Sequence, residues 1–239
     1  MPPKHKKNQS DASLGPQDDE QMPIFFHKEW EDYGYMSNYK PARFSAPDPA
    51  IACASWLLAS PRTADNNDAD ATPPQDAPTI EFQHSEQYYM YCKAACFGDA
   101  AACQRILAAT KASDCKDIAR TVRGFDAAVW SRNDRPLRVM ADALWHKFGG
   151  AHLQHVIDDG GDWLGREARA QLLPDIGRQL LDTGDRQLVE AAGRDSYWGI
   201  GYGIKQRPMQ YRKYWGKNHL GRSLVAVRER LRTLVESAP

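Results

Sequence analysis

The sequence predicts a mainly α fold with a small β component, of the α+β class, folded as a single domain. Apolar residues recur mostly at helical spacing, whereas the strand-like segments are few and short. These segments do not alternate with helices as in a doubly wound fold, and the sequence has no internal repeat. A length of 239 residues, 42% of them hydrophobic, is enough to enclose one sizeable core.

Two polar segments are expected to lie outside this core. Residues 1–21 are rich in Lys, Asp, Gln and Ser and cannot bury enough apolar surface to offset their ordering entropy, which predicts a disordered tail. Residues 60–78 have the Asp, Asn and Pro content of a mobile surface loop inserted into the domain. The domain itself is therefore expected to span residues 22–237.

The elements of the domain follow from local patterns. Residues 24–26 and 79–82 are typical of short strands, and Ser85 offers the side-chain acceptor of a helix N-cap, so a helix is predicted over 85–96. Further helices are predicted at 100–109, 114–122, 133–148, 151–158 and 166–181, and a strand at 187–191. The last helix carries an apolar stripe that we assign to the core: Leu220, Leu224, Val227, Leu231 and Leu234.

Composition excludes several classes of protein. Lys plus Arg equals Asp plus Glu at 31 each, so a polyanion must be bound by a local patch. The five cysteines form no C-x-x-C pair and the histidines show no metal-binding spacing, so we expect reduced thiols and no metal. Without an apolar segment of membrane length or a secretory signal, we expect no membrane partner and a cytoplasmic location, with the nucleus as alternative. The oligomeric state stays open.

The first candidate site lies on the helix predicted over 85–96. Seven residues make just under two helical turns, so Glu86 and Lys93 project from nearly the same side, with Met90 between them. Glu86 lies in the first turn, where the positive helix end favours a carboxylate, so without burial it should stay ionised near neutral pH. Such a group suits a base, a nucleophile or a stabiliser of positive charge. A surface carboxylate in a first turn is the common alternative.

Two further candidate sites follow the strand predicted at 187–191. Asp195 and the pair Tyr197-Trp198 lie in a glycine-rich loop, where aromatic rings could stack on a base or simply be buried. Asn218 is a plausible N-cap of the last helix, whose free N–H groups, reinforced by Lys217, could bind a phosphate, although ordinary capping is more frequent. Between these two sites, residues 205–215 interleave cationic and aromatic side chains, a mixture that single-stranded nucleic acids favour.

Taken in order, short motifs along the chain resemble one family. They are Asp32-Tyr33-Gly34 with Ser37-Asn38, Ser85-Glu86 with Tyr88-Tyr89 and Lys93, Trp130, Ala143-Leu144 with Lys147-Phe148, Asp195 with Trp198-Gly199, and Asn218 with Leu220-Gly221. This ordered set is similar to that of the NADAR family, also called YbiA-like. The resemblance extends over residues 24–234.

The resemblance implies a hydrolase of N-glycosidic bonds. The family acts on phosphorylated ribosylamino-pyrimidine intermediates of riboflavin biosynthesis and on ADP-ribose attached to guanine. Glu86 matches the catalytic glutamate, and Asn38, Trp130, Asp195 and Trp198 match pocket residues of the family. The further residues that we expect to contact the substrate are Tyr33, Ser37, Lys147, Gly199, Lys217 and Asn218. Two departures concern the choice of substrate: Gln87 stands where bacterial members often have His, and residues 200–215 interrupt a glycine-rich stretch.

The expected mechanism uses Glu86 to activate water and stabilise the oxocarbenium ion, and Asp195 as an orienting or acid group. In an alternative route, the amine of Lys93 attacks C1′ of a ring-opened sugar as a Schiff base. Neither route requires a metal or an organic cofactor. The cationic and aromatic segment favours ADP-ribosylated guanine in nucleic acid over the riboflavin intermediates. A non-catalytic module that binds ADP-ribose or NAD is the alternative of another class.

Overall fold

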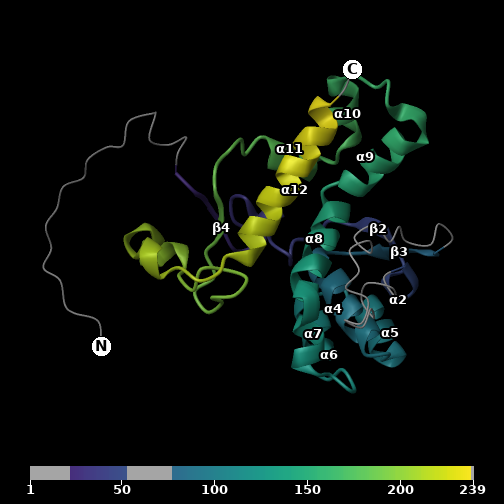
Figure 1. Cartoon of the computed structure of the whole chain (residues 1–239). Coiled ribbons are helices and arrows are strands. Elements are labelled where there is room, and N and C mark those ends of the chain that lie inside the picture. Colours follow the sequence, from purple (N-terminus) through teal and green to yellow (C-terminus); the bar gives the residue numbers. More distant parts are fainter. Residues whose placement is uncertain (1–21, 53–76, 238–239) are drawn as a thin grey trace, which may run out of the picture.

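A computed structural model describes residues 22–52 and 77–237. The predicted tail at 1–21 and residues 60–76 of the predicted insertion lie outside this part of the chain. Within it, helices predominate and the strands form two small sheets, which confirms the expected α+β class (Figure 1). The strands are β1 (Ile24–Phe26), β2 (Phe44–Pro47), β3 (Thr79–Phe82) and β4 (Leu188–Glu190).

The helices agree with the predicted segments, apart from a few residues at their ends and a few further short helices. They are α2 (Pro49–Ala52), α4 (Ser85–Cys96), α5 (Ala100–Ala108), α6 (Ala112–Ala119), α7 (Ala127–Ser131), α8 (Arg135–Lys147), α9 (Gly150–Val156), α10 (Arg166–Leu172), α11 (Asp175–Leu181) and α12 (His219–Glu236). One prediction was wrong: residues 166–181 form two helices instead of one. Leu173 is extended and Pro174 follows it, and proline disfavours helical backbone at the preceding residue.

The two sheets join segments that are far apart in the sequence. β1 pairs in parallel with β4, so that Phe26 lies opposite Glu190. β2 pairs antiparallel with β3, with Phe44 opposite Phe82. The strand β2 was not predicted, because its four residues, Phe-Ser-Ala-Pro, show little strand propensity apart from the phenylalanine.

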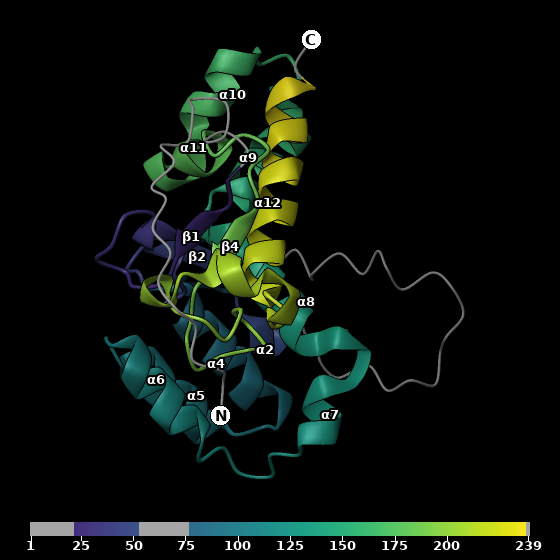
Figure 2. The same cartoon turned by 90° about the vertical axis from the view of Figure 1, so that its left-hand side faces the viewer.

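The helices form two groups at opposite ends of the molecule (Figures 1 and 2). At one end α4 packs against α5, α6 and α8; at the other α12 packs against α9, α10 and α11. The N-terminal part of α12 contacts β4, and α12 also packs along α8, so it connects the groups. The buried stripe of α12 is as predicted up to Leu231, after which Val235 is buried in place of Leu234.

Helix α4 is the central helix of its group and is buried on almost every side. Ten of its twelve residues are buried, Glu86 and Gln87 among them. Its predicted N-cap was wrong by one position: His84 has an extended backbone, and its Nδ1 accepts a hydrogen bond from the backbone N–H of Gln87 at 3.0 Å. Ser85 is therefore the first helical residue, and Glu86 lies second in the helix.

Candidate active site

The site forms where the carboxyl ends of β1 and β4 meet the start of α4. Because these strands are parallel, His27 after β1 and Glu190 at the end of β4 lie at the same edge. The backbone N–H of Glu86 donates to the carbonyl of Asn38 at 3.2 Å, which ties the start of α4 to the loop that follows β1. Glu86 lies close enough to Glu190 to interact with it electrostatically. The Nδ1 atom of His27 is buried and has no hydrogen-bond partner in the described part of the chain.

Glu86 is a buried carboxyl group. The residue is only 6% exposed. Burial raises the pKa of Glu86 to about 7, Lys116 acts in the opposite direction, and Asp195 adds a smaller upward effect. The helix N-terminus alone would keep an exposed first-turn carboxylate fully ionised. Burial therefore has a larger effect on the pKa of Glu86 than the helix N-terminus has. At neutral pH, Glu86 is therefore divided between its protonated and ionised forms.

A second carboxyl group, that of the partly buried Glu190, was not predicted from the sequence. Burial is the main reason that the pKa of Glu190 is raised to about 8, and the carboxylates of Asp195 and Glu86 raise it further. Its Oε2 atom is buried without a hydrogen-bond partner among the described residues. The only sequence signal was its position at the end of a predicted strand, next to a glycine-rich loop.

Asp195 organises the loop that follows β4. Its Oδ1 atom accepts hydrogen bonds from the backbone N–H groups of Tyr197 and Trp198, at 2.9 and 2.8 Å. Gly199 packs against β4 so closely that a Cβ atom there would lie 2.7 Å from the carbonyl oxygen of Glu190. These contacts place Trp198 and Asp195 at the site, which fits the orienting role expected for Asp195.

An aromatic cluster lies one helical turn beyond Glu86. The ring of Tyr89 makes edge contacts with Trp130 and with Trp198, each at a centroid distance of 5.6 Å. Trp130 is buried and Trp198 is half-buried. Tyr89 thus connects the two tryptophans that were expected to stack on the base. Tyr89 also interacts electrostatically with Glu86.

The basic partner of Glu86 in the described structure is Lys116 of α6, which was also missed. Lys116 also lies close enough to Tyr39 to oppose the rise that burial causes in the pKa of that residue. Lys93 instead donates to the carbonyl of Ala119 at 2.9 Å, and its amine lies 4.0 Å from the ring centre of Phe125. Burial lowers the pKa of Lys93, but a Schiff-base role would require its amine to leave this carbonyl. That role stays a prediction.

Ser37, Asn38 and Lys147 form the support behind Glu86. The amine of Lys147 is buried and donates to the carbonyl of Ser37 at 2.8 Å. Burial lowers the pKa of Lys147 to about 7. The side-chain oxygen of Asn38 is buried without a partner in the described residues, so it is available to a ligand.

The predicted phosphate site at the start of α12 is not formed by free N–H groups. Asn218 does not cap the helix with its side chain; instead it bonds the backbone of β4 at the N–H of Glu190 (3.0 Å) and the carbonyl of Leu188 (2.8 Å). The backbone N–H groups of residues 217–220 already donate to carbonyls of the loop at 196–199. Lys217 remains exposed.

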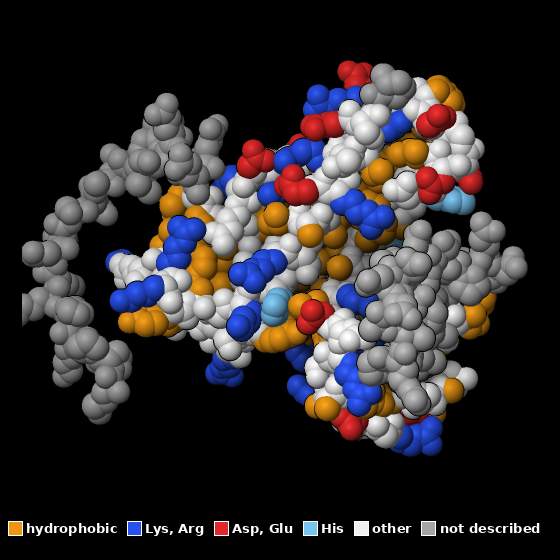
Figure 3. Space-filling model, viewed as in Figure 1, with side chains coloured by type: hydrophobic (Ala, Val, Ile, Leu, Met, Phe, Trp, Pro, Cys, Tyr) orange, Lys and Arg blue, Asp and Glu red, His pale blue; other side chains and the backbone are white. Residues whose placement is uncertain are grey.

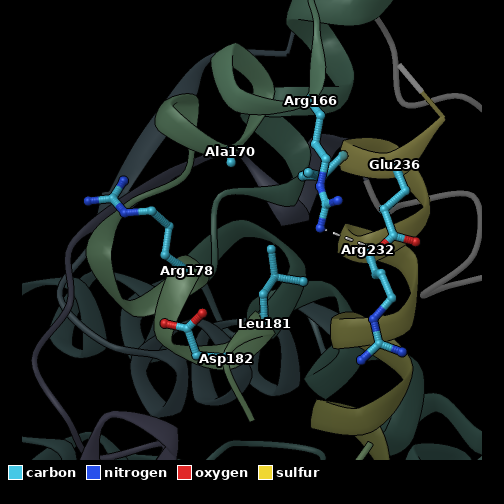
Figure 4. A pocket seen from close by; sticks show the side chains of 8 residues that line it. Arg166, Ala170, Arg178, Leu181, Asp182, Arg232 and Glu236 are labelled. Atoms are coloured by element: carbon cyan, nitrogen blue, oxygen red, sulfur yellow. Dashed lines mark ion pairs between the residues drawn. The ribbon is translucent and has the colours of Figure 1, made fainter. Parts of the chain in front are cut away.

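Two other predicted or notable features lie outside the site. Tyr33 has a left-handed backbone and lines a separate pocket of about 500 Å³ with Asp32 and Tyr35. A cavity of about 380 Å³ lies among α10, α11 and α12 (Figure 4). Three arginines line it, and each already has an acidic partner: Arg166 pairs with Glu236 at 3.9 Å, Arg178 with Asp175, and Arg232 with Asp185 and Glu229.

Gln87, a departure from the family pattern, does not line the site. Its amide nitrogen donates to three carbonyls at the end of α5, including those of Ile106 and Ala109 at 2.9 Å, and its oxygen accepts from the N–H of Gln83. Gln87 therefore ties α4 to α5, and it does not select the substrate by direct contact. The described residues contain no group of side chains that could hold a metal ion and no helix able to span a membrane.

Comparison with known proteins finds two relatives that are N-glycosidases. An N-glycosidase of Acanthamoeba polyphaga mimivirus is 31% identical over 150 residues, covering 62% of this chain and 74% of the relative. An N-glycosidase of Nostoc punctiforme is 27% identical over 214 residues, covering 90% and 96%. Both relatives are named N-glycosidases, which confirms the expected class of enzyme, a hydrolase of N-glycosyl bonds.

The fold resembles the solved structure of the Escherichia coli protein YbiA, with a TM-score of 0.50 and 21% identity over 89% of this chain and 86% of that one. The family model of the NADAR domain matches residues 24–232. This chain belongs to the NADAR domain family, as the ordered motifs predicted.

Proposed function

We propose that this protein hydrolyses the bond between a ribose and a nucleobase, and that its substrate is guanine carrying ADP-ribose. The observation that carries the proposal is the buried carboxyl group of Glu86 beside the Trp130, Tyr89 and Trp198 cluster. A carboxylate that stabilises positive charge, next to aromatic rings that hold a base, is what cleavage of a ribosyl C1′–N bond needs.

In this reaction Glu86 acts in its ionised form. The carboxylate stabilises the positive charge that develops on the ribose ring and removes a proton from the attacking water. Lys116 favours the ionised form of Glu86 because it is the nearby cation that lowers the pKa of this group. Asp195 holds Trp198 against the base through its two bonds to the loop backbone.

The preference for ADP-ribosylated nucleic acid is supported by the segment at 200–215. It carries four exposed cationic side chains, and Figure 3 shows Lys and Arg among hydrophobic side chains over this part of the surface. They are Lys205, Arg207, Arg212 and Lys213. Tyr202 and Tyr211 stack with parallel rings, 5.2 Å apart. The base of the segment is tied to the site because the N–H of Ile200 donates to the carbonyl of Glu190 at 3.0 Å.

The test compares release of the free base from two substrates: an oligonucleotide with ADP-ribosylated guanine, and a phosphorylated ribosylamino-pyrimidine. The proposal expects faster turnover of the oligonucleotide, and a smaller salt dependence of KM when Lys205 and Arg207 are replaced by Ala. Faster turnover of the pyrimidine intermediate would assign the riboflavin substrate class instead. Binding of ADP-ribose in a calorimeter with no turnover of either substrate would indicate a non-catalytic binding module.

A further inference from the structure

The proposed reaction leaves one carboxyl group of the site unused, that of Glu190, a partly buried residue whose Oε2 atom is buried. Glu190 is held by its backbone on both sides: its N–H donates to Asn218 at 3.0 Å and its carbonyl accepts from Ile200 at 3.0 Å. Its Oε2 atom is enclosed by protein and has no partner among the described residues. A buried polar atom without a partner costs free energy, and in a rigid site it points to a group that arrives with the ligand.

The charged groups that face Glu190 come from three parts of the fold. Asp195 of the following loop and Glu86 of α4 disfavour its ionised form, whereas Lys116 of α6 favours it. Burial has the largest effect, and together these causes raise the pKa of Glu190 to about 8. Near neutral pH Glu190 therefore keeps its proton, while Glu86, whose pKa is about 7, is ionised in a substantial fraction of molecules. The two carboxyl groups are thereby suited to opposite roles.

We propose, resting on the hydrolysis proposed above, that Glu190 is the general acid that protonates the departing base. When the C1′–N bond breaks, its electron pair passes to the nitrogen, which takes the proton of Glu190. The oxygen of water bonds to C1′, and the proton it loses goes to the carboxylate of Glu86. Passage of one proton from Glu86 back to Glu190 restores the starting state.

Asp195 is less suited to this role, because its Oδ1 atom already accepts two backbone N–H bonds that hold the loop. The Oε2 atom of Glu190 has no hydrogen-bond partner in the described structure, and the backbone N–H of Glu190 is held by Asn218. Glu190 can therefore donate its proton without disturbing the loop that positions Trp198. The sequence order also fits, since Glu190 ends the strand from which this loop starts.

The experiment compares the native protein with Glu190→Gln on the oligonucleotide carrying ADP-ribosylated guanine, over about pH 5 to pH 10. We expect kcat to fall by about 10²–10⁴-fold with little change in KM, because a general acid acts in the transition state. The native profile should lose activity on its basic side as Glu190 ionises, and this limb should be absent from the residual activity of the variant. Glu190→Asp, which keeps an acid with a shorter reach, should recover part of kcat. Glu167→Gln, at an exposed glutamate of α10, is the control and should behave as the native protein.

A second readout does not depend on turnover. The infrared band of a protonated carboxylic acid should be present in the native protein at neutral pH and diminished in Glu190→Gln. A folded Glu190→Gln with native kcat, or with the basic limb retained, would overturn the role of Glu190 and leave the proposed function intact. An unchanged infrared band would overturn it as well. Failure of the native protein to release base from either substrate would instead overturn the proposed function.

Discussion

The burial of Glu86 predicts that this residue lowers the stability of the native protein at neutral pH. Its pKa rises from the ordinary 4.5 to about 7, mainly because the carboxylate loses its solvation. Since one pKa unit corresponds to about 1.36 kcal/mol, ionisation of the unfolded chain favours unfolding by up to about 3 kcal/mol at pH 7. Below about pH 4.5 Glu86 is protonated in both the native and the unfolded chain, so this loss of native stability is absent. The loss develops as the pH rises from about 4.5 through about 7.

Glu86→Gln should remove this penalty, because glutamine has nearly the same shape and cannot ionise. At about pH 8 we expect the free energy of unfolding to increase by roughly 1–3 kcal/mol, and its fall between about pH 4.5 and pH 7 to become shallower. Urea unfolding followed by tryptophan fluorescence at several pH values measures both quantities. Glu167→Gln, also in the first turn of a helix but exposed, should leave both unchanged. If Glu86→Gln is no more stable than the native protein at pH 8 and keeps the native slope, burial does not destabilise the ionised form of Glu86.

Three more predictions concern neighbouring residues. Asn218→Ala removes two hydrogen bonds to the backbone of β4 and leaves buried groups unpaired, so urea unfolding should show a loss of about 2–4 kcal/mol; a loss below about 0.5 kcal/mol would contradict this role. Lys116→Met should move the acidic limb of the pH–rate profile to higher pH, because the cation that lowers the pKa of Glu86 is lost. Lys93→Met should leave this limb in place, since the amine of Lys93 bonds the carbonyl of Ala119. The reverse result would favour the pairing of Glu86 with Lys93 that was predicted from the sequence. Trp198→Ala should raise KM about 10–100-fold for loss of base stacking, and an unchanged KM would exclude that contact.

The part of the site that could be predicted from sequence is the part that lies in local motifs. The family motifs identified Glu86, Trp130 and Trp198, and the structure joins the two tryptophans through Tyr89. Helical spacing alone also paired Glu86 with Lys93. That pairing was not found, because spacing along one helix does not reveal that α6 supplies a nearby carbonyl for the amine of Lys93.

The residues that were missed depend on burial and on long-range contacts. Glu190 is a single glutamate at the end of a three-residue strand, and only its buried Oε2 atom and its proximity to other carboxylates set it apart. Asn218 resembled an N-cap in the sequence, but its side chain bonds a strand about 30 residues away in the chain, and helix propensity cannot foresee such a contact. The strand β2 was missed because its residues show little strand propensity, so that only its pairing with β3 defines it.

The most direct test of the account is the rate at which Glu86→Gln releases free base from the oligonucleotide carrying ADP-ribosylated guanine, measured beside the native protein by chromatography. We expect the variant to be folded and at least as stable as the native protein at neutral pH, and release of the base to be abolished. Turnover by Glu86→Gln at the native rate would contradict the assignment of Glu86 as the catalytic carboxylate.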